Sequence, residues 1–193
     1  AGWEPVRAAF EGNLAAGREV GAAVAVYHRG QRVVDLAGGS FDEEGTRPYT
    51  DDTLQLVFST TKGIAALAVA LCVERGLLDY DAPVVDVWPE FGAAGKERIT
   101  VAQLLSHQAG LPVVDRPLTI DEVLDWDRMV DVLAAQAPVW EPGSAHGYHA
   151  VTFGWLAGEL VRRVDPEGRT LGGFVAGDLT GPIGAEAWIG LPE

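Results

Sequence analysis

The segment Phe58-Ser59-Thr60-Thr61-Lys62-Gly63 places a serine three residues before a lysine. A serine hydroxyl becomes an effective nucleophile when a neighbouring base accepts its proton, and a lysine can be that base if its pKa is lowered. Residues at i and i+3 share one face of a helix, so a helix beginning near Ser59 would bring the two side chains together. The N–H groups at the start of that helix would suit a developing oxyanion. The pair therefore indicates acyl transfer.

The tetrapeptide alone also has a structural interpretation. Ser59 could be the N-cap of a helix, and Lys62 a solvated residue in its first turn. Lysine is rare in this chain, where Lys62 and Lys96 are the only two examples, which makes a chance match less common. The tetrapeptide by itself leaves both interpretations open.

The residues after Lys62 predict a buried helix that ends near Gly76. The run from Gly63 to Gly76 is rich in Ala and Leu, is apolar on nearly every face, and has a glycine in place for a C-cap. Cys72 lies within it and is expected to be a small core residue. The longest apolar stretch, Ile64–Val73, is too short to span a bilayer.

Composition limits the class of protein. The chain has 193 residues, is 48% hydrophobic and carries a formal net charge of −14, which predicts a globular domain and argues against binding to nucleic acid or an anionic membrane. A single cysteine excludes an internal disulfide and a multi-cysteine zinc site. No signal peptide is recognisable, so we expect a soluble, cytoplasmic protein.

The elements around the nucleophile segment are predicted from periodicity and turn residues. An amphipathic helix over 3–17 precedes two strands, 21–28 and 32–39, and a polar loop follows over 40–53. Thr100 is expected to cap a short helix over 101–107. One or two further helices are predicted over 119–136, and one each over 150–164 and 171–178. An irregular connection is predicted over 77–98, and an exposed loop or strand over 188–193.

This inventory predicts an α+β fold with an incomplete sheet. A two-stranded hairpin is marginally stable by itself, and the apolar first strand needs neighbours. We therefore expect residues 1–58 to form the helix and hairpin of an α/β part, and residues 59–193 to hold the nucleophile helix and a mainly helical part. The remaining strands should lie in a continuation or in a second chain.

Four blocks in this order resemble the serine β-lactamase-like superfamily, and within it the family VIII carboxylesterases. The blocks are Phe58–Gly63, Thr100–Pro112, Trp140–Gly143 and Tyr148–Ala150. The resemblance implies a β-lactamase/transpeptidase-like α/β sandwich, an antiparallel sheet flanked by helices plus an all-helical region, of which this chain would hold about half. It also implies a serine hydrolase that needs no metal or cofactor.

The resemblance implies roles for individual residues. Ser59 matches the acylated nucleophile and Lys62 its partner. Tyr148 matches the tyrosine that shares the role of general base with that lysine. From the sequence alone, a packed aromatic after a Pro-Gly turn would be the preferred interpretation of Tyr148, and the resemblance reverses that preference. His149 is a candidate to line the substrate pocket, with a surface histidine as the alternative.

Two departures from the family pattern bear on the substrate. Ala150 stands where β-lactamases and DD-peptidases carry an asparagine that binds the substrate amide, which favours small esters as substrates. A Lys-Thr-Gly-like strand that supplies the second oxyanion donor has no counterpart, so the 193-residue chain alone should be nearly inactive. A β-lactamase or D-amino-acid peptidase with the same residues, and a non-catalytic relative that binds or scaffolds, are the alternatives.

Other serine and histidine residues are weaker candidates for catalysis or metal binding. Ser106 and His107 are adjacent, so on a helix their side chains point in different directions and cannot pair as nucleophile and base; His107 is expected to be structural. His146 and His149 flank Tyr148 without the spacing of a metal motif. The expected partners are a small ester and the portion that completes the sheet; a homo-oligomer is compatible with the sequence.

Overall fold

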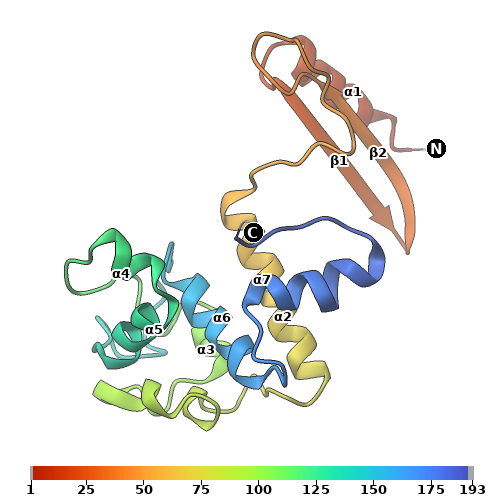
Figure 1. The fold of residues 1–193 in the computed structure, drawn as a ribbon. Coiled ribbons are helices and arrows are strands. Elements are labelled where there is room, and N and C mark those ends of the chain that lie inside the picture. The colour runs from red at the N-terminus through yellow and green to blue at the C-terminus, as the bar shows by residue number, and fades with distance from the viewer. Residues whose placement is uncertain (1, 191–193) are drawn as a thin grey trace. The chain divides into compact units, whose positions relative to one another are not determined.

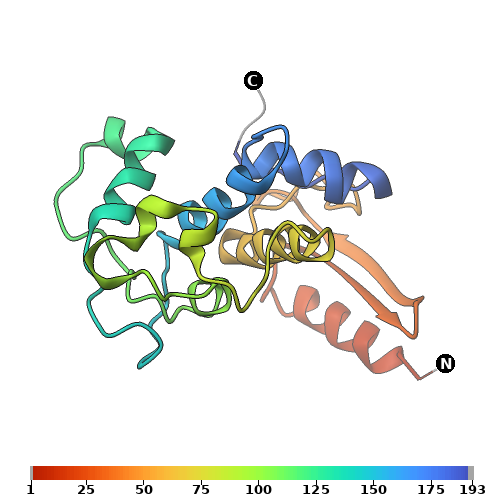
Figure 2. The same cartoon turned by 90° about the horizontal axis from the view of Figure 1, so that it is seen from below.

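A computed structural model describes residues 2–190, and the chain divides into two compact units, Ala1–Leu56 and Val57–Glu193 (Figures 1 and 2). The first unit is α+β and the second is helical. The helices and strands are α1 (Glu4–Ala15), β1 (Gly21–His28), β2 (Gln31–Gly39), η1 (Phe58–Thr60), α2 (Thr61–Glu74), η2 (Val84–Asp86), η3 (Pro89–Gly95), α3 (Val101–Leu105), α4 (Ile120–Leu124), α5 (Trp126–Ala135), α6 (Phe153–Val164), α7 (Leu171–Phe174), η4 (Val175–Thr180) and η5 (Gly181–Ile183).

The first unit is built on the predicted hairpin. Strands β1 and β2 pair antiparallel, with Gly21 opposite Gly39 and His28 opposite Gln31. The two residues between the strands, Arg29 and Gly30, both have positive φ (52° and 77°), as a tight type I′ turn requires. Within residues 2–190 this hairpin is a sheet of two strands, in agreement with the predicted shortage of strands.

Helix α1 packs on β2 through small residues of the strand. A Cβ placed on Gly38 would lie 3.3 Å from Leu14 and 3.6 Å from Phe10, so the glycine lets the apolar face of the helix approach the sheet. The prediction of an amphipathic helix followed by a hairpin is confirmed for this unit. Several β1 side chains stay exposed, Tyr27 at 66% among them.

In the second unit, α6 is the central helix. It contacts α2, α3, α5 and α7, and its residues Leu156, Ala157, Leu160 and Val161 are fully buried. Helix α2 packs on it through its Ala and Val positions, and Cys72 is fully buried as predicted. Burial raises the pKa of the Cys72 thiol to about 11, so this cysteine is an unreactive core residue.

The ends of the helices follow the chemistry of their caps. Gly76 has φ 70°, and the N–H groups of Gly76 and Leu77 donate to the carbonyls of Val73 and Cys72, which is a Schellman motif that ends α2. Thr100 and Gln103 form a reciprocal capping box at the start of α3, as predicted from the threonine.

Three predicted boundaries were wrong by several residues. Helix α3 stops at Leu105, because His107 adopts a left-handed φ of 63°. Helix α6 begins at Phe153 and not near Ala150. Helix α7 ends at Phe174, and wider π-type and 3₁₀ turns continue from it to Ile183. The loop or strand predicted over 188–193 falls partly outside the described residues.

Candidate active site

Ser59 lies just before α2, in a single 3₁₀ turn formed by residues 58–60. Phe58, the residue before it, has φ 44°, a left-handed conformation that costs a bulky side chain energy. Strained residues of this kind cluster at functional sites, where the surrounding structure holds them. The Ser59 side chain is exposed and lines a cavity.

Lys62 connects Ser59 to a distant segment of the chain. Its Nζ donates to Ser59 Oγ at 3.0 Å and to the carbonyl oxygen of Ala150 at 2.7 Å. The first contact is the i, i+3 pair expected from the sequence. The second brings residues around Tyr148 to the start of α2.

Tyr148 lies beside this pair. Lys62 Nζ is 4.9 Å from the centroid of the Tyr148 ring, within the range of a cation–π contact. Hydrogen bonding to Ser59 and then to Lys62 lowers the pKa of the Tyr148 phenol below its ordinary value of 10.0. The three predicted residues therefore come together, and Tyr148 is 52% exposed.

Two of the four sequence blocks lie side by side next to these residues. The backbone N–H of Val139 donates to Gly110, that of Gly143 to Gln108, and that of Gly147 to His107. Trp140 packs against Gly147, where a Cβ would lie 2.5 Å from the indole ring. The segment that carries Tyr148 is thus aligned along the segment after α3.

His107 holds the backbone on both sides of Tyr148. Its carbonyl oxygen accepts the N–H of Gly147 at 3.1 Å, and its ring Nδ1 accepts the N–H of His149 at 3.1 Å. The His107 ring also contacts the Tyr148 ring, with centroids 5.0 Å apart. Burial first, and then the neighbouring histidines and Lys62, lower the pKa of His107, which favours the neutral ring that this acceptor role requires. The sequence indicated a structural residue here but not its partners.

His149 does not occupy either place predicted for it. The residue is fully buried, so it is not a surface histidine, and it is absent from the lining of the Ser59 cavity. Its Nε2 accepts the N–H of Leu111 at 2.9 Å, and its Nδ1–H therefore donates to the carbonyl of Gly147 at 2.6 Å. Both ring nitrogens are engaged with the backbone, and we correct the expected substrate-binding role to a structural one.

The cavity at Ser59 has a volume of about 690 Å³. Ser59, Thr61, Lys62 and Thr170 contribute polar groups, and most of the remaining wall is apolar. Ala150 lines it too, and the carbonyl oxygen of this residue accepts the hydrogen bond from Lys62. Trp126, Trp155 and Leu171 also line this cavity, and no pattern in the sequence indicated this.

The other sites that the sequence suggested lack catalytic geometry. Ser106 Oγ donates to the carbonyl of Ala102 at 2.7 Å, whereas the His107 ring engages His149, so the two do not pair. No group of three His, Cys, Asp or Glu in residues 2–190 is placed to hold a metal ion. No helix in the same residues is long and apolar enough to cross a membrane.

Comparison with known proteins identifies a family and several relatives. The family model described as "Beta-lactamase" matches residues 6–193. "Esterase/beta-lactamase LipL" of Mycobacterium tuberculosis is 45% identical over 144 residues, covering 75% of this chain and 33% of the relative. "Esterase EstB" of Burkholderia gladioli is 34% identical over 194 residues, covering 92% of this chain and 48% of the relative. The chain thus spans half or less of the length of these two relatives.

A solved structure is similar to this chain in both fold and sequence. A crystal structure described as a family VIII carboxylesterase superposes with a TM-score of 0.92 at 48% identity, covering 98% of this chain and 52% of that one. The fold is therefore β-lactamase/transpeptidase-like with an incomplete sheet, as predicted. A match over nearly the whole sequence, a shared fold and a serine–lysine pair at the head of a buried helix together place this chain in the beta-lactamase family.

Proposed function

We propose that this chain carries the nucleophile and general base of a serine carboxylesterase that acts on small esters. The observation that supports this most is the position of Lys62 Nζ, which contacts Ser59 Oγ at 3.0 Å and lies 4.9 Å from the centre of the Tyr148 ring. An alcohol, an amine and a phenol grouped in this way can serve acyl transfer as nucleophile, stabilising cation and base. The relatives whose names include "esterase" support the same reaction.

In the proposed reaction, Ser59 Oγ attacks the ester carbonyl carbon and its proton passes to the Tyr148 phenolate. The tetrahedral intermediate then collapses, the carbon–oxygen bond to the alcohol breaks, and Tyr148 returns the proton to the departing alkoxide. The acyl group remains on Ser59. Water attacks the acyl carbon while Tyr148 again accepts a proton. The bond between that carbon and Ser59 Oγ then breaks, Tyr148 returns the proton to Oγ, and the carboxylic acid is released.

Tyr148 is the better candidate for the base in this arrangement. Lys62 already donates hydrogen bonds to Ser59 and to Ala150, whereas Tyr148 has a pKa shifted toward its anionic form. Lys62 would then stabilise the phenolate and position the serine hydroxyl. The N–H of Ser59, at the start of the helix, would be one donor to the oxyanion.

We further propose that a partner portion completes the site. This chain spans 48% of EstB and 52% of the carboxylesterase structure, and its sheet has two strands within the described residues. A strand from a continuation or a second chain would supply the other oxyanion donor. Loss of one such donor costs about a hundredfold or more in rate, so residues 1–193 alone should be nearly inactive beside the complete protein.

The direct test is Ser59→Ala in the complete protein, assayed with p-nitrophenyl butyrate. We expect a loss of about a thousandfold or more, because loss of a nucleophile removes the covalent route. Ser106→Ala is the matched control, since Ser106 is an exposed serine of the same unit whose hydroxyl binds only neighbouring groups. Unchanged hydrolysis by Ser59→Ala would refute the proposal.

A β-lactamase is the second candidate, because one relative is named "Esterase/beta-lactamase". Ala150 offers a methyl group to the cavity and has no side-chain amide to bind a substrate amide, which favours esters. A chromogenic cephalosporin hydrolysed much faster than p-nitrophenyl butyrate would decide for the β-lactamase.

A further inference from the structure

The apolar wall of the Ser59 cavity includes one residue with a polar anchor. Trp126 is the first residue of α5, is half-buried, and lines the cavity together with Phe153, Trp155 and Leu171. Its indole Nε1 donates to Glu159 Oε2 at 2.9 Å. A large ring fixed at one end is suited to set the size of a pocket, because it cannot swing aside without losing its hydrogen bond.

The fit of the ring depends on a glycine. A Cβ placed on Gly158 would lie 2.6 Å from Trp126 Cη2 and 3.1 Å from Cζ2, closer than packed atoms tolerate. The same Cβ would lie 3.6 Å from Leu171 Cβ, so the indole edge sits over the α6 backbone beside another cavity residue. The position of Trp126 is thus determined by packing as well as by its hydrogen bond.

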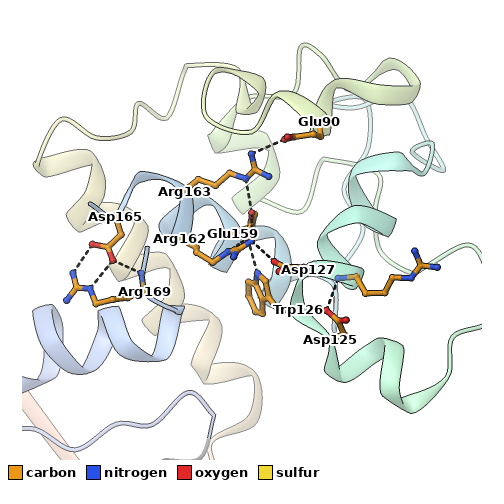
Figure 3. Close-up of polar contacts among 10 residues, drawn as sticks. Glu90, Asp125, Trp126, Asp127, Glu159, Arg162, Arg163, Asp165 and Arg169 are labelled. Atoms are coloured by element: carbon orange, nitrogen blue, oxygen red, sulfur yellow. Dashed lines mark hydrogen bonds and ion pairs between the residues drawn. The ribbon is translucent and has the colours of Figure 1, made fainter. Parts of the chain in front are cut away.

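Glu159 is a rigid anchor. The residue is fully buried and accepts hydrogen bonds from Arg162 Nε at 2.8 Å and from Arg163 Nε at 2.7 Å in addition to the indole (Figure 3). Burial raises the pKa of this carboxyl, but the donors from Arg162, Trp126 and Arg163 outweigh it, and the net shift is downward. A buried carboxylate with this many donors has little freedom to rotate.

Each arginine is held from its other side. Arg162 Nη2 lies 2.8 Å from Asp127, and Arg163 Nη1 lies 2.9 Å from Glu90 (Figure 3). Glu90 and Asp127 are exposed, so the network runs from solvent through the two arginines to Glu159 and ends at the indole. The indole N–H is the one uncharged donor to Glu159 among these contacts.

We propose that Trp126 limits the length of the acyl chain accepted beside Ser59, and that Glu159 is a positioning residue that holds the indole in the cavity wall. This inference rests on the proposed esterase function. The acyl group is the part of the substrate that stays on Ser59 after the alcohol leaves, so it occupies the apolar wall through both steps. The proposed substrates are esters with an apolar acyl chain short enough to fit between Ser59 and the indole of Trp126.

The kinetic test compares p-nitrophenyl butyrate with p-nitrophenyl octanoate in the complete protein. Trp126→Ala should raise the octanoate-to-butyrate ratio of kcat/KM by about tenfold or more, since each added methylene then finds apolar contact. Glu159→Gln and Trp126→Phe should shift the ratio in the same direction by about threefold, mainly through KM. Glu97→Gln, which changes an exposed carboxylate outside this network, should leave the ratio unchanged.

Two results would overturn the inference. One is a ratio that stays within about twofold of wild type in Trp126→Ala. The other is an equal loss for all esters in Glu159→Gln or Trp126→Phe, which is what a structural role alone would give. If Glu159→Gln fails to fold, Trp126→Phe still decides, because it removes the N–H and leaves the carboxylate and both arginines intact.

A binding experiment separates this inference from the esterase proposal. Non-hydrolysable 4-nitrophenyl butyl and octyl ethers are titrated against Ser59→Ala protein and followed by quenching of tryptophan fluorescence. Adding Trp126→Ala should improve the affinity for the octyl ether over the butyl ether by about fivefold or more. This result would support the role of Trp126 in limiting chain length even if no ester were hydrolysed. An unchanged preference between the two ethers would contradict that role even in an active esterase.

Discussion

Lys62 Nζ lies 2.7 Å from the carbonyl oxygen of Ala150, 88 residues later in the chain. This contact fastens the segment after Tyr148 to the first turn of α2, where Ser59 lies. One side chain therefore both touches the proposed nucleophile and fixes the backbone next to the proposed base. The arrangement explains how a phenol distant in sequence reaches the start of the helix.

Tyr148→Phe should remove the base and change the pH dependence. We expect kcat/KM to fall by about a hundredfold or more, as for loss of other general bases. The pKa of Tyr148 is lowered from 10.0, so the phenolate forms at lower pH than usual and wild-type activity should rise through a midpoint below 10.0. Measurement of kcat/KM between pH 6 and about pH 10 tests both points.

Tyr80→Phe is the control for that profile, since Tyr80 is another partly exposed tyrosine of the same unit, at 37%. It should keep both the rate and the alkaline rise. A Tyr148→Phe protein with the same rise would assign the proton to another group.

His107→Leu should lower kcat more than it changes KM. The variant loses the ring acceptor that holds the N–H of His149, and the Tyr148 ring loses its neighbour. A misplaced base costs about 10–100-fold in rate. His107→Asn should recover much of the loss, because asparagine offers an acceptor oxygen and tolerates the φ of 63°. Equal kcat values for Leu and Asn variants would rule out this positioning role.

Acid should destabilise the fold in the range where histidines titrate. Burial, the largest influence, lowers the pKa of His149 below 6.5. A second ring proton would also displace the N–H of Leu111, which Nε2 accepts. The unfolded chain binds that proton near pH 6.5 and the folded chain only at lower pH. The stabilising contribution is therefore complete above pH 6.5 and is lost as the pH falls through the folded value.

The measurement is Tm between pH 8 and about pH 5, above the range where ordinary carboxyl groups take up protons. His149→Gln should flatten the acid decline at the cost of overall stability. His146→Gln, at an exposed histidine nearby, should retain it. An acid decline unaffected by His149→Gln would contradict this source of pH dependence.

Lys96→Met should destabilise the second unit, although Lys96 has no part in the proposed reaction. Lys96 is fully buried, and its Nζ donates to the carbonyls of Ala93 at 2.7 Å and Ala134 at 3.0 Å, and to that of Gln136. The last two carbonyls end α5, where a cation also complements the helix dipole. Leaving these acceptors without a donor should cost about 2–4 kcal/mol of unfolding free energy. Arg98→Met, at an exposed neighbour, is the charge-matched control for urea unfolding.

Much of the fold could be predicted from the sequence because the signals were local. The hairpin turn at Arg29 and Gly30, the capping box at Thr100 and the C-cap at Gly76 each depend on a few adjacent residues. The contact between Ser59 and Lys62 could be predicted for the same reason, since it lies within one helical turn. The end of α3 was misplaced because nothing in the sequence indicates that His107 is left-handed.

The rest of the site depends on long-range contacts. Only the family resemblance suggested Tyr148. The contact that brings its segment to Ser59 joins Lys62 to Ala150, which are 88 residues apart, so no local pattern reveals it. His149 was predicted to line the pocket because it is next to Tyr148. Its position in the sequence does not show which way its side chain points. The hydrogen bond between Trp126 and Glu159 joins α5 to α6 and leaves no pattern in the sequence.

The most direct test of the central claim is to label the complete protein with a fluorophosphonate and locate the adduct by peptide mass spectrometry. This reagent captures a serine only when a neighbouring base activates it. We expect a single adduct on Ser59, formed much more slowly in Tyr148→Phe. An adduct on another residue, or no labelling of Ser59 in a folded complete protein, would contradict it.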